Sequence, residues 1–357
     1  MRPRLRRAVA NLALLTVSLI VAFFLFELGV RILEPQPEAR YRFSPYTYYE
    51  PVPGAEFVYE RIEFSVPVSF NGFGMRDAPR ELEKPAGRLR VTVLGDSYAE
   101  ALQVPADSTT SRLLERELRR RHPGRDIEVL NFGVSGFGTV ASAVRYQVLV
   151  SRFRPDLVVY LFVSNDPWDV LSRDARLYEV RDGEIVFRTI DLGPARRAVR
   201  YVADFMKHHF HTYRFLKYRL LVRNERRARE EARDRATVAG TDELLPGDAA
   251  WERMRMALQR LRDDVSGDGA RLLVAQATTR GPDMDARLAG LCRELEIPFR
   301  SLVPALRADP GPVHFRFDGH WRARGHDIAA REIADLLADH IPAPRMELGG
   351  SLRETPE

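Results

Sequence analysis

Two short patches of the sequence carry the side chains that nucleophilic acyl transfer requires. Ser97 closes a Gly-Asp-Ser sequence directly after an apolar run at residues 89–94. Asp318 and His320 lie about 220 residues downstream and supply an acid and a base. A serine hydroxyl becomes an effective nucleophile beside a base, and a carboxylate can orient that base. The two patches together therefore predict a Ser-His-Asp arrangement, whereas either patch alone is also typical of an ordinary turn.

The segments that must position these side chains alternate between strand and helix patterns. Apolar runs predict strands at residues 89–94, 127–130, 156–163, 271–275 and 299–303. Apolar residues at helical spacing predict helices at residues 139–153, 249–265, 284–295 and 323–340. A further helix is expected to begin with Asp107 or Ser108 as its N-cap and to end near Arg121. Strands that alternate with helices imply a parallel sheet covered on both faces, which is an α/β fold.

Polar or glycine-rich patches follow the carboxyl ends of these strands. Ser97 follows the first strand, residues 131–136 (Asn-Phe-Gly-Val-Ser-Gly) follow the second, and residues 164–166 (Ser-Asn-Asp) follow the third. Asp318 and His320 come after the fifth strand and before the last helix. Because function gathers at the carboxyl ends of strands in open α/β sheets, we expect the four patches to form one site.

The four patches in this order resemble those of the SGNH hydrolases in the GDSL esterase/lipase superfamily, in their membrane-anchored bacterial form. The similarity covers roughly residues 89–341 and is weak in residues 168–248. Residues 71–76 (Asn-x-x-Gly-x-Arg) also resemble a lead-in segment of anchored members. The resemblance implies a flavodoxin-like three-layer α/β/α fold and serine hydrolase chemistry, without specifying the substrate.

The resemblance also implies a role for each residue of the site. Ser97 would be the nucleophile, His320 the general base and acid, and Asp318 the group that orients the histidine. The backbone N–H groups of Ser97 and Gly136 and the side-chain amide of Asn165 would stabilise the oxyanion. No metal or organic cofactor is expected.

Some residues near these patches have other interpretations. Many family members space the acid and the base as Asp-x-x-His, whereas this chain has Asp-x-His, so Asp166 is an alternative orienting acid. Gly133 and Gly136 are also compatible with a tight strand-to-helix turn alone. His314 lies close to the base in sequence, and His326 is expected on the last helix.

The N-terminus has the pattern of a membrane anchor. Residues 8–26 are almost wholly apolar and span roughly 28 Å as a helix, close to the thickness of a hydrocarbon core. Four arginines precede this run, so we expect residues 1–34 to be an uncleaved signal anchor in the inner or plasma membrane with a cytoplasmic N-terminus. The rest of the chain would be periplasmic or extracellular. A cleaved signal peptide is the alternative, but residues 23–34 offer no convincing small-x-small site.

Positive charge is concentrated in residues 196–235, which carry 13 Arg or Lys and 5 Asp or Glu residues. Outside this segment and the N-terminal arginines the chain carries about −7, which disfavours nucleic-acid binding. Apolar residues from Val202 to Leu220 fall at helical spacing. This stripe predicts either a helix packed on its own domain or a helix on an anionic membrane surface. The nearby histidines (208, 209 and 211) lack Cys or acidic partners, so a metal site is not expected.

The remaining segments complete the predicted organisation. Residues 35–88 indicate a linker followed by a pre-domain of short strands, residues 89–341 the hydrolase domain, and residues 342–357 a disordered tail. Residues 168–248 are an insertion that contains a predicted β-hairpin at residues 178–189. Cys292 is the single cysteine, which excludes an intramolecular disulfide, and we interpret it as a small buried apolar residue.

These patterns predict an anchored serine esterase that cleaves acyl esters, O-acetyl groups of envelope glycans or lipid esters in particular. An O-acyltransferase, in which a hydroxyl of an envelope polysaccharide takes the acyl group from Ser97, would use the same residues. A non-catalytic envelope scaffold is the third possibility. The sequence does not indicate an oligomeric state.

Overall fold

The chain forms two compact units. The computed structural model describes residues 3–34, 40–217, 219–220, 223 and 247–341, so the predicted tail at residues 342–357 lies outside the described residues. One unit comprises Met1–Phe43 and Asp191–Leu245. The other comprises Ser44–Ile190 and Pro246–Glu357 and contains all four polar patches.

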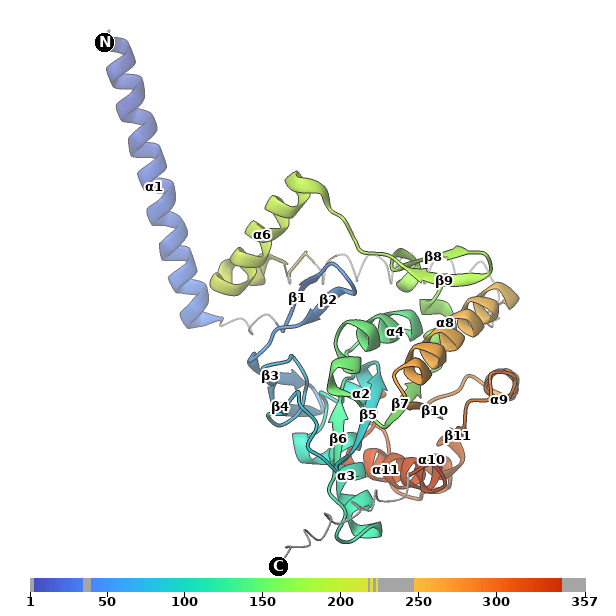
Figure 1. The fold of residues 1–357 in the computed structure, drawn as a ribbon. Coiled ribbons are helices and arrows are strands. Elements are labelled where there is room, and N and C mark those ends of the chain that lie inside the picture. Colours follow the sequence, from blue (N-terminus) through green and yellow to red (C-terminus); the bar gives the residue numbers. More distant parts are fainter. Residues whose placement is uncertain (1–2, 35–39, 218, 221–222, 224–246, 342–357) are drawn as a thin grey trace, which may run out of the picture. The chain divides into compact units, whose positions relative to one another are not determined.

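The larger unit is built on a five-stranded parallel sheet with the strand order β11-β10-β7-β5-β6 (Figure 1). Its strands are β5 (Leu89–Gly95), β6 (Ile127–Asn131), β7 (Leu157–Phe162), β10 (Arg271–Gln276) and β11 (Phe299–Ser301). Helices flank this sheet, which confirms the predicted α/β/α architecture. The strands β6, β5 and β7 are neighbours, so the first three polar patches follow adjacent strands.

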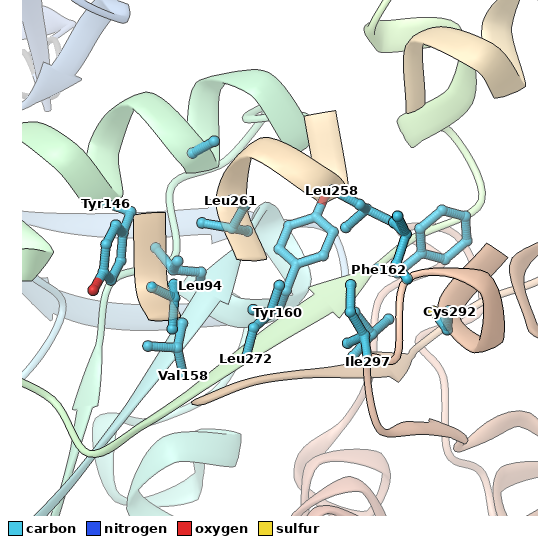
Figure 2. Packing of buried hydrophobic residues seen from close by; sticks show 14 of the residues in the cluster. Leu94, Tyr146, Val158, Tyr160, Phe162, Leu258, Leu261, Leu272, Cys292 and Ile297 are labelled. Atoms are coloured by element: carbon cyan, nitrogen blue, oxygen red, sulfur yellow. The ribbon is translucent and has the colours of Figure 1, made fainter. Parts of the chain in front are cut away.

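Both faces of the sheet are buried under helices. Alternate side chains of β7 enter two different cores: Tyr160 and Phe162 pack with residues of α4, α8 and α9, whereas Val159 and Leu161 pack with residues of α3 and α11. Figure 2 shows the first core, with Cys292 of α9 within it. The helices are α2 (Ser97–Glu100), α3 (Thr110–Arg121), α4 (Thr139–Val148), α5 (Asp166–Asp169), α8 (Asp248–Gly267), α9 (Pro282–Glu294), α10 (Val303–Ala308) and α11 (Ala323–Ala338).

Cys292 is fully buried, as predicted, and burial raises the pKa of its thiol to about 12. A thiol that stays protonated in an apolar core is a poor nucleophile. The residue therefore acts as a small apolar side chain in the packing of α9.

Short antiparallel hairpins accompany the sheet. β3 (Glu56–Arg61) pairs with β4 (Phe64–Ser69), and β8 (Tyr178–Arg181) pairs with β9 (Glu184–Phe187), while β2 (Tyr48–Pro51) precedes β3. The two residues between β8 and β9, Asp182 and Gly183, both have positive φ, at 52° and 81°. That backbone matches the right-handed twist of paired strands and confirms the predicted hairpin.

The smaller unit contains α1 (Pro3–Leu33), α6 (Gly193–His209) and helical residues 211–217, and β1 (Tyr41–Ser44) crosses its boundary. Within α1, Val9–Leu33 has a mean hydropathy of 2.5. This segment is long and apolar enough to cross a membrane, a property that signal sequences share.

Three predicted helix boundaries are wrong. The helix expected to start from a cap at Asp107 or Ser108 is capped instead by Thr109, because this residue is extended and its hydroxyl accepts the N–H of Arg112. The helix expected at residues 139–153 ends at Val148 and is followed by a 3₁₀ turn. The stripe from Val202 to Leu220 is not one helix, since Phe210 is extended and separates α6 from the next helical stretch.

Arg90 of β5 is fully buried beside Glu128 of β6, with 2.6 Å between Nε and Oε1, and it donates to the carbonyls of Leu82 and Phe153. Replacing Arg90 by Ala leaves the buried Glu128 carboxylate without this partner. We expect Arg90→Ala to lower the free energy of unfolding by about 3–5 kcal/mol. A fall in Tm of roughly 10 °C in detergent micelles would correspond to this loss. The exposed Arg307 provides the control; equal melting of Arg90→Ala and Arg307→Ala would contradict the assignment.

Candidate active site

Ser97, His320 and Asp318 form a continuous hydrogen-bonded chain. His320 Nε2 lies 2.7 Å from Ser97 Oγ, and His320 Nδ1 lies 2.6 Å from Asp318 Oδ1. A carboxylate only accepts, so Nδ1 carries the proton in this arrangement and Nε2 is left to accept the serine hydroxyl. All three side chains are partly exposed. This geometry suits transfer of a proton from the serine to the imidazole.

The Asp-x-His spacing works because Gly319 reverses the chain. Its φ is +82°, a left-handed conformation that glycine adopts without strain. The turn is closed by two backbone hydrogen bonds: Phe315 N–H donates to the His320 carbonyl, and Gly319 N–H donates to the Phe315 carbonyl. Asp318 can therefore reach the ring of a residue only two positions later.

The imidazole of His320 packs against Tyr98, the residue that follows Ser97. The two ring centroids are 4.8 Å apart, and the Tyr98 hydroxyl donates to the Gly319 carbonyl. The buried indole of Trp321 packs edge-on against Tyr98 at 5.0 Å and against His326 at 5.4 Å. His326 lies in α11 as predicted, where its Nδ1 contacts the Thr110 hydroxyl at 2.8 Å.

Ser97 is the first residue of the short helix α2, which is fixed at both ends. Asp96 caps its N-terminus, with Oδ1 accepting the N–H of Tyr98, and burial raises the pKa of Asp96 to about 6. At the other end, Arg76 donates to the carbonyls of Glu100 and Val104. The backbone at Ser97 is therefore held by its neighbours, and the serine Oγ lies 2.7 Å from His320 Nε2 and 3.3 Å from Asp96 Oδ2.

The lead-in segment at residues 71–76 positions the Arg76 side chain beside α2. Asn71 Oδ1 accepts the N–H groups of Phe73 and Met75, and Gly74 has a φ of +69°. The turn places the buried guanidinium of Arg76 beside the helix that begins with Ser97.

The loop that contains Gly136 is attached to α2. Glu100 Oε2 accepts the N–H and the hydroxyl of Ser135, and Val134 N–H donates to the Gly95 carbonyl. Gly136 has a φ of +81°, and its carbonyl accepts from Arg173 at 2.7 Å. The loop after β6 therefore lies against the segment that starts at Gly95.

Asn165 follows β7, and its side-chain amide donates to Asp169 Oδ2 at 2.7 Å. An amide nitrogen carries two hydrogens, so this contact orients the group and leaves a second donor. Asp166 faces the core instead: it is fully buried, its Oδ2 accepts from the Tyr160 hydroxyl and Val163 N–H, and burial raises its pKa well above the ordinary value. Asp318, not Asp166, lies against His320.

Glu63, at the tip of the β3–β4 hairpin, holds the loop that carries Asp318. Its carboxylate accepts three consecutive N–H groups, from Arg316, Phe317 and Asp318, at 2.6 to 3.0 Å. Burial opposes ionisation of this carboxyl, but the three donors outweigh it and lower its pKa. Sequence reasoning missed Glu63, because no local pattern links a residue to a loop more than 250 positions away.

A cavity of about 190 Å³ adjoins Gly136. Its walls include Tyr49, Phe137 and Arg173, together with other residues near the start of β2 and after α5. Sites for drug-sized ligands measure roughly 300–1,000 Å³. Of the predicted site residues, only Gly136 lines this cavity, so its volume does not define the space for an acyl group beside Ser97.

Comparison with known proteins points to one family. Residues 93–328 match the model of the GDSL-like lipase/acylhydrolase family. No curated protein gave a significant match.

Several solved structures resemble the chain at low identity. TesA is 13% identical over 70% of this chain and 98% of its own, with a TM-score of 0.42. LAE5, an α/β hydrolase from the metagenome of Lake Arreo in Spain, is 13% identical over 72% and 97%, with a TM-score of 0.41. A single-residue variant of Axe2, an acetyl xylan esterase of Geobacillus stearothermophilus, is 14% identical over 71% and 96%, with a TM-score of 0.39.

Gly133 allows the loop after β6 to approach α2. A Cβ atom at Gly133 would lie 2.3 Å from the backbone nitrogen of Glu100 and 2.6 Å from atoms of Ala99. We expect Gly133→Ala to lower the free energy of unfolding by about 1–3 kcal/mol, since α2 or the loop must move. The fall in Tm should be absent in Gly72→Ala, because a Cβ atom there meets nothing within 4 Å. Equal Tm values for the two variants would disprove this packing constraint.

Proposed function

Because the chain belongs to the GDSL-like lipase/acylhydrolase family and is an SGNH-type serine hydrolase, we propose that it is a membrane-anchored esterase that removes short acyl groups from envelope glycans or lipids. The observation that carries this proposal is the position of His320, with Nε2 at 2.7 Å from Ser97 Oγ and Nδ1 at 2.6 Å from Asp318.

In the proposed acylation step, Ser97 Oγ attacks the ester carbonyl carbon and its proton passes to His320 Nε2. The Nδ1–H to Asp318 hydrogen bond stabilises the imidazolium that forms. His320 then returns the proton to the leaving alcohol as the carbon–oxygen bond breaks, which leaves an acyl ester on Ser97. A water molecule repeats the sequence, releases the carboxylic acid and regenerates Ser97.

The developing oxyanion would be stabilised by donors at the ends of three adjacent strands. The backbone N–H groups of Ser97 and Gly136 and the second amide hydrogen of Asn165 are the proposed donors. The Asp169 contact supports this role of Asn165, because a donor held in place beforehand stabilises the transition state without reorganisation.

The membrane-anchored part of the proposal rests on α1. Val9–Leu33 has the length and hydropathy of a spanning helix, and the arginines before it favour a cytoplasmic N-terminus. The hydrolase unit would then act in the periplasm or at the cell exterior, where acyl esters of envelope glycans and lipids would be its substrates.

Turnover of p-nitrophenyl acetate by the full chain in detergent micelles tests this proposal. We expect Ser97→Ala and His320→Ala to lower kcat/KM by at least roughly 10³-fold, since the two groups act as a unit. Asn165→Ala should lower kcat by about 10²–10³-fold. Ser266→Ala, at an exposed position of α8, is the matched control. Equal turnover by wild type and Ser97→Ala, or no reaction of wild type with a fluorophosphonate, would refute the proposal.

Glu63 has a positioning role in the same proposal. We expect Glu63→Ala to lower kcat by roughly 10–100-fold with little change in KM, because small displacements of Asp318 are enough to misalign His320. Glu63→Gln should be intermediate, since its amide oxygen still accepts an N–H group but carries no charge. Glu60→Ala, at an exposed position of the same hairpin, should keep full turnover. An unchanged kcat in Glu63→Ala would show that the loop is held without this carboxylate.

A further inference from the structure

Glu27 places an acidic side chain inside the apolar segment of α1. Its side chain is only 8% exposed, and its carboxylate accepts the N–H groups of His211 and Thr212 at 3.0 and 2.8 Å. Arg31, one turn later, donates to the same carboxylate at 3.3 Å. These donors compensate a charge that would otherwise be costly in an apolar span.

These contacts set the position of the C-terminal end of α6 along the axis of α1. The apolar segment ends at Leu33. Glu27 lies six residues before this end, about 9 Å along the helix axis, and Phe23 lies ten residues before it, about 15 Å. The ring of Phe210 packs against Phe23 with centroids 5.3 Å apart. The junction between α6 and residues 211–217 therefore lies level with the apolar segment and not beyond its end.

The helix α6 has two chemically different sides. Apolar residues on one side are exposed, among them Val199 at 71%, Tyr201 at 76%, Val202 at 57% and Phe205. Basic residues, Arg196, Arg197, Arg200 and Lys207, lie on the other side at helical spacing. Among the residues that the structure describes, none buries Val199, Val202 or Phe205.

We propose that α6 lies in the interfacial layer of the bilayer, with its apolar side toward the acyl chains and its arginines at anionic headgroups. This inference rests on the proposed anchoring by α1. A helix of this kind buries its apolar side by about 5–10 Å, which agrees with a junction at the level of Glu27. Arg196 would add electrostatic attraction to an anionic surface, whereas Arg197 and Arg200 are ion-paired with Asp191 and Asp204.

The depth of the junction favours lipid over a soluble protein partner. The residues directly after α6 contact Phe23 and Glu27, so under the proposed anchoring the C-terminal end of α6 lies at a level where the surrounding medium is lipid. Apolar side chains that remain exposed in such a unit meet acyl chains without any further partner.

Quenching of a fluorophore on single added cysteines tests the proposal in the full chain. Val202→Cys lies on the apolar side, and Arg197→Cys, five residues earlier and about 140° around the helix, is the matched polar-side position. Leu15→Cys reports whether α1 is in the bilayer. Cys292 is fully buried, so it stays in place, and labelled wild type provides the blank. The protein is reconstituted in phosphatidylcholine–phosphatidylglycerol vesicles and exposed to aqueous iodide or to lipids carrying nitroxides.

We expect the Val202→Cys label to be quenched by the lipid nitroxide and its iodide quenching to be at least about threefold weaker than that of Arg197→Cys. Equal iodide quenching at the two positions, with Leu15→Cys protected, would overturn the position of α6 and leave the anchor intact. Protection of Val202→Cys from iodide without lipid quenching would mean that protein covers α6, which also overturns the proposal. A Leu15→Cys label open to iodide would refute the anchor itself.

Discussion

Carboxylates that accept backbone N–H groups hold the loops of this protein in place. Glu63 binds three such groups beside Asp318, Glu100 binds Ser135, and Asp96 caps the helix that starts at Ser97. Loops lack the regular backbone hydrogen bonds of helices and sheets, so their N–H groups need other acceptors. One carboxylate that accepts several N–H groups can therefore fix a backbone that would otherwise move. The distances around His320 depend on this fixation.

Burying carboxylates near one another has a thermodynamic cost. Burial raises the pKa of Asp96 to about 6 and that of Asp174, which accepts the N–H groups of Val140 and Ala141, to about 7. A carboxyl whose pKa is higher in the folded than in the unfolded state binds its proton more tightly when folded. As the pH rises from about 4 to about 7, ionisation of the Asp96 and Asp174 carboxyls therefore reduces the stability of the folded chain.

The alternation of strand and helix patterns was sufficient to predict the parallel sheet with helices on both faces. The neighbours β6, β5 and β7 carry Gly136, Ser97 and Asn165 at their ends because parallel strands align their carboxyl ends, a rule that needs no coordinates. Glu63 was beyond such reasoning, since an isolated acidic residue in a hairpin gives no sign of its partner. The break at Phe210 was also unpredictable, because helical spacing continues through it and tertiary contacts end α6 there.

The path of the chain bears on how an anchored esterase would work. Residues 191–245 leave the hydrolase unit after β9 and belong to the unit that contains α1, so the two units are joined at three places in the chain and not by one linker. Under the proposed anchoring, Ser97 and an ester of the same envelope are confined to one compartment, which raises the effective concentration of ester near Ser97. Glu27 then has a second consequence under the proposed anchoring: by accepting the N–H groups of His211 and Thr212, it keeps residues 211–217 beside α1 and therefore near the membrane.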